Sequence, residues 1–186
     1  MGNAPWGPLC PPEKVFRGIS GRNVSKFVLD GRRMLRERYQ GNYASGEHDR
    51  NSLFALCLPS MAQFRKIYCV KGRRVLRENQ HATYFEDSVG LVADWRKAGH
   101  VWEIPYGALI PDKVDGLLAA GRCAAAEGDA WEVTRVIPAA ALTGQAAGLA
   151  AALSLDKGVP PSMLDVKALQ AELRKLGFPL HLGDLG

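Results

Sequence analysis

Residues 116–153 read GLLAAGRCAAAEGDAWEVTRVIPAAALTGQAAGLAAAL, a stretch that predicts a short strand, a turn and then a long helix. The apolar run of residues 117–120 stops at Gly121, which is typical of a buried strand that ends in a tight turn. We expect the helix to begin at Pro138, because proline is tolerated at the first helical position, where its missing N–H would have no intrahelical partner.

The expected helix, residues 138–154, has one face with almost no side-chain bulk. Gly144, Gly148 and Ala152 recur every four residues, so another group can approach the helix backbone closely. One interpretation is tight packing of the helix on a sheet. The other is a cofactor ring at the helix N-terminus, where free N–H groups and the positive dipole end stabilise a partly anionic oxygen. Thr143, Gln145 and the lack of large lipid-facing side chains argue against a membrane span.

The order of motifs in this stretch is more specific than any single motif. The apolar run leads to Gly121-Arg122-Cys123, then to Thr134-Arg135-Val136 and Pro138, and finally to LTGQAAG at residues 142–148. This order resembles the C-terminal, flavin-contacting segment of the FAD-dependent oxidoreductase family, which is distantly similar to flavoproteins of the succinate dehydrogenase and fumarate reductase type. The resemblance implies that the helix N-terminus faces the pyrimidine edge of the flavin.

The resemblance also implies two sets of site residues. Arg135 and Tyr106 are the candidate catalytic residues, since an arginine at this motif position binds a substrate carboxylate in the fumarate reductase type. The alternatives are an Arg135 that pairs with Glu127, Asp129 or Glu132 to hold its loop, and a Tyr106 that is a core aromatic residue. The candidate cofactor-binding residues are Gly121, Arg122, Pro138, Ala139, Ala140, Gly144 and Gln145.

One of these candidates departs from the wider pattern. Distant relatives carry Asp or Glu after the glycine, where the carboxylate accepts hydrogen bonds from ribityl hydroxyls. Arg122 is a donor that suits phosphate or carboxylate instead. The closer family resembles this chain in having Gly-Arg here, so Arg122 supports membership but weakens the ribityl role.

The resemblance covers roughly residues 17–180 but corresponds only to the later part of the family's proteins. Those proteins begin with a βαβ unit whose G-x-G-x-x-G turn lets the FAD pyrophosphate sit on a helix N-terminus. This sequence has no two glycines two positions apart. We therefore expect weak FAD binding and no activity from the lone chain, as a fragment, half of a split enzyme or a decayed copy. A separate chain with the G-x-G-x-x-G half is the expected partner.

The fold class that we expect is α+β, a fragment of an α/β FAD-binding fold. Residues 1–104 are expected to form a substrate-side or cap-like region, with a helix at 22–39 and an antiparallel or mixed sheet from strands within 64–104. Residues 64–70 and 73–76 are a candidate strand pair around Gly72. Residues 105–186 are expected to form the C-terminal part of the FAD-binding domain.

The C-terminal segment predicts one more helix. Residues 159–161, Val-Pro-Pro, break the chain, and Asp165 is a suitable N-cap for a helix with leucines at positions 169, 173 and 176. Gly177 fits the end of that helix. The last residues are expected to be a loose tail.

Composition narrows the function classes. Of the 186 residues, 47% are hydrophobic and 23% charged, as in ordinary soluble globular proteins. The net charge is +7 over residues 1–110 and −2 over residues 111–186, yet the basic residues are interleaved with apolar helix positions, and we expect no nucleic-acid partner. Asp87 and Asp94 are seven residues apart across an apolar run, so structural roles are favoured over a metal or acid/base pair.

The cysteines form no C-x-x-C pair, so no zinc or iron–sulfur site is expected. The four cysteines, at positions 10, 57, 69 and 123, are expected to be reduced core thiols. The N-terminus does not resemble a signal peptide, which favours a cytoplasmic protein without a membrane partner. The expected function is flavin-mediated hydride transfer with a small organic substrate; the alternative is a cofactor-free interaction module that uses its basic face.

Overall fold

The computed structural model describes residues 19–58, 60, 66 and 68–186 of the chain. By compactness the chain divides into two units, residues 1–67 and residues 68–186. This division falls before residue 104, the position of the boundary that we expected between the cap-like region and the FAD-binding part. The expected boundary is a functional one in the family's longer proteins, and it stays a prediction.

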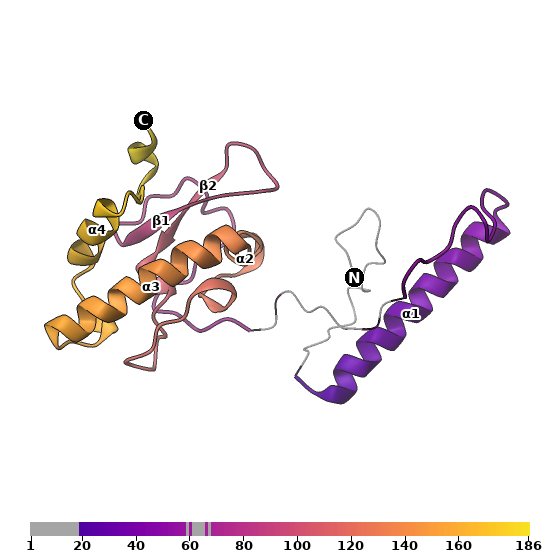
Figure 1. Ribbon diagram of the computed structural model, residues 1–186, viewed down its shortest axis with the longest axis horizontal. Coiled ribbons are helices and arrows are strands. Elements are labelled where there is room, and N and C mark those ends of the chain that lie inside the picture. Colours follow the sequence, from indigo (N-terminus) through magenta and orange to yellow (C-terminus); the bar gives the residue numbers. More distant parts are fainter. Residues whose placement is uncertain (1–18, 59, 61–65, 67) are drawn as a thin grey trace. The chain divides into compact units, whose positions relative to one another are not determined.

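The first unit contains the helix α1, Gly21–Ala44, which confirms the expected helix at 22–39 and extends it by one turn. Ser20 is its N-cap, and the Ser20 side chain accepts a hydrogen bond from the backbone N–H of Asn23 at 3.2 Å. Gly31 is buried within the helix, as expected for a glycine that permits close packing. The segment after α1 runs back beside the helix (Figure 1).

The second unit is built around two antiparallel strands, β1 (Ser88–Ala93) and β2 (Val101–Pro105). Leu91 pairs with Glu103, and the register shifts between Ser88 and Leu91. At this irregularity Gly90 has a φ of +149°, and a Cβ atom there would lie 2.7 Å from the Leu142 side chain. The missing side chain of Gly90 therefore makes room for a leucine of α3 against the strand.

Helices cover this strand pair, which confirms the α+β class. They are α2 (Gly128–Thr134), α3 (Ile137–Lys157) and α4 (Val166–Lys175). In Figure 1 α3 lies across the two strands, and α4 lies beside one end of α3. Four short 3-10 helices connect these elements: η1 (Tyr106–Ala108), η2 (Gly121–Cys123), η3 (Pro161–Met163) and η4 (Leu182–Leu185).

Local signals placed the two longer helices of this unit correctly. α3 begins at Ile137 with Pro138 in its first turn, one residue before the expected start. The Asp165 side chain caps α4 by accepting the backbone N–H of Lys167 at 3.0 Å. Gly177, just beyond the α4 C-cap, has a φ of +83°, the left-handed conformation in which glycine commonly ends a helix.

The expected sheet is smaller than the sequence indicated. Residues 117–120 are extended but form no strand, because only one backbone bond to a neighbouring segment, Ala119 N–H to the Leu109 carbonyl at 2.8 Å, holds them within the described chain. The expected partner of residues 73–76 was residues 64–70, of which 64, 65 and 67 lie outside the described residues. Instead, Gly72 and Leu76 form isolated bridges to Pro111 and Ala126.

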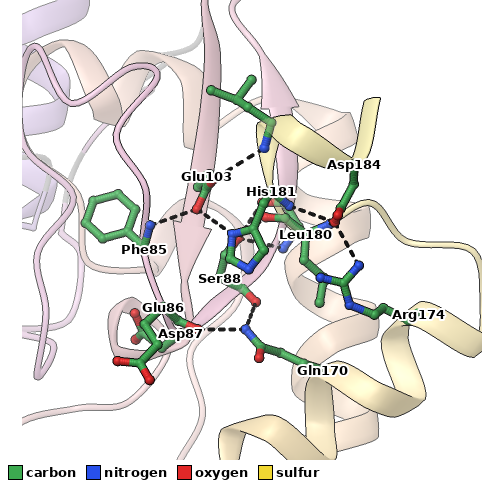
Figure 2. Close-up of polar contacts among 12 residues, drawn as sticks. Phe85, Glu86, Asp87, Ser88, Glu103, Gln170, Arg174, Leu180, His181 and Asp184 are labelled. Carbon is green, nitrogen blue, oxygen red and sulfur yellow. Dashed lines mark hydrogen bonds and ion pairs between the residues drawn. The ribbon is translucent and has the colours of Figure 1, made fainter. Parts of the chain in front are cut away.

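The C-terminal segment is attached to the strand pair and is not the loose tail that we expected. Leu180 is fully buried, and its carbonyl accepts the Ser88 hydroxyl at 2.6 Å. The Glu103 carboxylate on β2 is 1% exposed and lies 3.0 Å from Nδ1 of His181. Figure 2 shows these contacts converging from β1, β2 and the chain end, together with Gln170 of α4. The buried carboxylate therefore anchors the chain end to the sheet.

Candidate functional site

The N-terminal half of α3 packs directly against the turn at Gly121. The backbone N–H of Gly121 donates to the Thr143 hydroxyl at 2.8 Å, and that hydroxyl donates to the Ala139 carbonyl at 2.6 Å. Gly121 has a φ of +68°, and a Cβ atom at this position would lie 3.3 Å from the Ala140 Cβ. The sequence Gly-Arg-Cys is thus placed beside the first turns of α3.

The first turn of α3 is open. Its N-cap residue, Val136, makes no side-chain capping bond, and Ile137 is 86% exposed. The first N–H groups of a helix have no intrahelical partners and carry a partial positive charge. Pro138 is exposed in this turn but has no N–H, Ala139 is buried, and the Ala140 N–H donates to the Val136 carbonyl at 3.0 Å. Ile137 is therefore the exposed residue of this turn whose N–H has no intrahelical acceptor.

The glycine stripe of α3 faces away from the core. Gly144, Gln145 and Gly148 are exposed, and a Cβ atom at either glycine would meet nothing within 4 Å. The core is instead contacted by an alanine face that includes Ala146 and Ala150, both fully buried. By length and composition α3 could also cross a membrane, although its alanine face belongs to the core of this unit. The helix-on-core packing therefore uses alanines, and the glycine stripe stays open.

Arg135 is held by a carboxylate one turn earlier. Its Nε donates to Glu132 Oε2 at 2.7 Å, and its side chain is 9% exposed. Of the three carboxylates that we considered as partners, the structure places Glu132 at this position. Arg135 lies two residues before the start of α3, and its guanidinium is held against Glu132 of α2.

Arg122 lies on the surface beside α2. Its side chain is exposed, and its carbonyl accepts the indole N–H of Trp131 at 2.9 Å. The bond connects the Gly121 turn to α2, the short helix that leads into Arg135 and α3. The backbone of Arg122 therefore helps to hold α2, the helix that leads to Arg135, against the Gly121 turn.

Tyr106 is separated from the other candidates. Its hydroxyl donates to the carbonyl of Pro161, in the segment that follows the C-terminal end of α3. A helix of 21 residues is about 30 Å long, and Arg135 and Pro138 are at its opposite end. Tyr106 is 2% exposed, and burial raises its pKa to about 12. This environment is that of the core aromatic residue in our alternative, and a phenol so placed stays protonated at neutral pH.

A partly buried ion cluster supports α2 and thereby the approach to α3. Arg96, in the connection between β1 and β2, forms ion pairs with Asp94 at 2.8 Å and with Asp129 of α2 at 2.6 Å. The hydrogen bonds from Arg96 hold the pKa of both carboxyl groups below the usual value of 3.8. Asp94 thus has a structural role, and so has Asp87, whose Oδ2 accepts the Gly107 N–H at 2.9 Å.

Two features of this region had no local signal in the sequence. Thr143 is the pivot between the Gly121 turn and α3, but a threonine within a helix of small residues does not indicate such a bond. The partner of Arg96 on α2 is 33 residues away in the chain. Cys57 and Cys123 are exposed, which corrects the expectation of core thiols, while Cys69 is half-buried and Cys10 lies outside the described residues.

Comparison with known proteins agrees with this geometry. A sequence model of the family described as FAD dependent oxidoreductase matches residues 75–173, more than half of the chain. The match includes β1, β2, α2, α3 and most of α4, and it leaves out α1. The chain therefore belongs to the FAD dependent oxidoreductase family. No curated protein and no solved structure matches it.

Proposed function

We propose that this chain is the C-terminal portion of an FAD-dependent oxidoreductase and holds the flavin end of the cofactor against residues 135–145. The observation that carries the proposal is the contact between Gly121 and α3. It fixes the turn beside Ala140, next to the exposed helix start at Ile137. Bound FAD would supply hydride acceptance from a small organic substrate.

The chain's own groups fit the flavin end of the cofactor and not its phosphates. At the start of α3 the exposed Ile137 would offer its N–H to a partly anionic oxygen, and the helix dipole favours negative charge there. Gly144 and Gln145 follow on the exposed side, where no side chain blocks a planar ring. No pair of glycines with the G-x-G spacing is present to receive a pyrophosphate.

Arg135 would act on an anionic substrate from beside the open helix end. Its guanidinium has five N–H donors, and the Glu132 contact occupies only part of this fork. Because the Arg135 side chain is 9% exposed, a substrate carboxylate would bind to the donors that stay accessible beside Glu132, which keeps the side chain in place. Tyr106 is proposed only as a support of the far end of α3, because its hydroxyl is bonded to Pro161.

A second chain with the G-x-G-x-x-G half would complete the cofactor site, and the lone chain would be inactive. The proposed setting is cytoplasmic, with neither nucleic acid nor membrane as partner. The alternative function, an interaction module that works through its basic face, is favoured by one observation in the first unit, the arginine-lined groove beside α1.

The test is reconstitution with a dinucleotide-binding half from the same family. We expect a flavin absorption spectrum in the purified complex and flavin reduction by small organic acids. Arg135→Lys should keep the spectrum and lower kcat/KM. The loss should correspond to about 1.5 to 3 kcal/mol of transition-state stabilisation, the usual value of a charge-assisted hydrogen bond. Unchanged kcat/KM beside a lowered melting temperature would assign Arg135 to structure alone.

A further inference from the structure

The first compact unit contains an open groove that the family match does not include. The groove, of about 610 Å³, lies between α1 and residues 50–58, and we call it the α1 groove. Its outer wall is held in place, because the Tyr43 hydroxyl donates to the Leu53 carbonyl at 2.6 Å. Asp49 fixes the intervening turn by accepting the N–H groups of Asn51 and Ser52 at 2.9 and 2.8 Å. The groove is thus a preformed feature of this unit.

The floor of the α1 groove is apolar and exposed. Leu29, Phe54 and Leu58 line it, and each is more than half exposed. Large apolar side chains gathered in one depression commonly mark a binding surface, whereas single exposed ones need no explanation. The α1 groove therefore has the apolar contact area that a ligand or partner could bury.

The rim of the α1 groove is positively charged. Arg32, Arg36 and Arg50 line it, and none of the described lining residues is acidic. Within the described chain Arg36 and Arg50 form no ion pair, whereas Asp30, which does not line the groove, pairs with Lys26 and Arg33. The groove thus combines an apolar floor with the positive charges of Arg36 and Arg50, which are unpaired among the described residues.

The length of the groove indicates the class of its occupant. Its α1 wall extends from Leu29 to Tyr43, which is about 21 Å at the helical rise of 1.5 Å per residue. A groove of this length, with apolar anchors and basic sides, fits an amphipathic helix with acidic flanks. We propose that the α1 groove binds an acidic amphipathic helix of a partner protein.

Other occupants fit the same surface less well. A second copy would place the arginines of two grooves near one another, and like charges across an interface oppose association. Nucleic acid would match the charge, and its bases could stack on the rings of Tyr39, Tyr43 and Phe54, but it would leave the leucine side chains of the floor without apolar partners. An acidic helix uses both the charge and the aliphatic surface.

The test uses the full chain and a fluorescently labelled peptide of about 16 residues. The peptide has leucines at helical spacing and glutamates on both flanks; a second peptide has lysines in place of the glutamates. We expect the glutamate peptide to bind, and the double variant Arg36→Glu, Arg50→Glu to weaken it by about tenfold or more. The matched control, Arg22→Glu with Arg38→Glu, changes the same charge away from the groove and should alter the affinity by less than about twofold.

A charge-exchange measurement distinguishes the loss of charge complementarity from misfolding of the variant. The Arg36→Glu, Arg50→Glu protein should gain affinity for the lysine peptide, which a disordered unit would not do at this site. Equal weakening by the two double variants would overturn the proposal, and so would failure of the glutamate peptide to bind the unaltered chain. Dimerisation that depends on Arg36 and Arg50, or tighter binding there of a single-stranded oligonucleotide or an anionic vesicle, would also overturn it.

Discussion

The hydroxyl of Thr143 on α3 accepts the backbone N–H of Gly121 at 2.8 Å and donates to the carbonyl of Ala139 at 2.6 Å. Both bonds are buried; the first joins the turn that precedes α2 to the helix that follows it, and the second lies within α3. One side chain therefore links the Gly121 turn directly to α3.

Thr143→Val should destabilise the protein, because valine has the same shape but cannot accept the Gly121 N–H. An unsatisfied buried donor costs about 1 to 3 kcal/mol in the free energy of unfolding, which urea titration can measure. Thr134→Val is the matched control, since Thr134 is also buried and its hydroxyl has no hydrogen-bond partner within the described chain. If the two valines had equal effects, the Thr143 bond would not be the cause.

Gly121→Ala should also destabilise the protein, for two separate reasons. A φ of +68° is unfavourable for alanine, by about 1 kcal/mol or more, and the new Cβ would press on Ala140 at 3.3 Å. Gly116→Ala has the first cost without the second, because its φ is +70° and nothing lies within 4 Å. The melting temperature should therefore fall further for the Gly121 variant; the reverse order would argue against close packing of the turn on α3.

The Arg96 cluster should make stability depend on acid pH. The folded-state pKa values of Asp94 and Asp129 are lowered from 3.8 by hydrogen bonds from Arg96. Their contribution is therefore fully present above about pH 4 to 5, and it is lost as the pH falls through the folded-state values. Arg96→Met should lower the free energy of unfolding at pH 7 by about 2 to 3 kcal/mol, since Asp94 is buried, and should flatten this pH dependence.

Lys97→Met is the control for the cluster. Lys97 is half-exposed and lies 3.4 Å from Asp129, so its loss should cost less than about 1 kcal/mol. A pH profile for Arg96→Met that matches that of the unaltered protein would show that the two carboxyl groups do not depend on Arg96.

The sequence predicted the elements whose signals are local. Pro138, Asp165 and Gly177 act on the backbone within a few residues, and the start of α3 and both ends of α4 follow from them. Residues 117–120 have the composition of a strand, but a strand exists only if another segment supplies a ladder of hydrogen bonds, and Ala119 finds one bond.

The candidate site was predictable in its motif and not in its contacts. The motif order brought Gly121 and the α3 helix into one segment, and the bond between Gly121 and Thr143 is seen only in the structure. The chain end is held by Ser88, which bonds to Leu180 92 positions away, and by Glu103, which contacts His181 and Leu182 78 and 79 positions away. No local pattern in the sequence indicates such pairs. The partners of Arg135 and Tyr106 differ in predictability for the same reason. The partner of Arg135 is one turn away and was among the alternatives considered, whereas Tyr106 is bonded to a segment 55 positions later.

The most direct test of the central claim is the affinity of FAD for the chain alone and with its proposed partner. Equilibrium dialysis or flavin fluorescence titration should show no sub-micromolar binding to the lone chain, because most anchoring in such folds comes from the ADP half of the cofactor. Addition of a dinucleotide-binding half with the G-x-G-x-x-G turn should bring the FAD affinity into the sub-micromolar range. Tight FAD binding by the lone chain, or no gain when that half is added, would contradict the account.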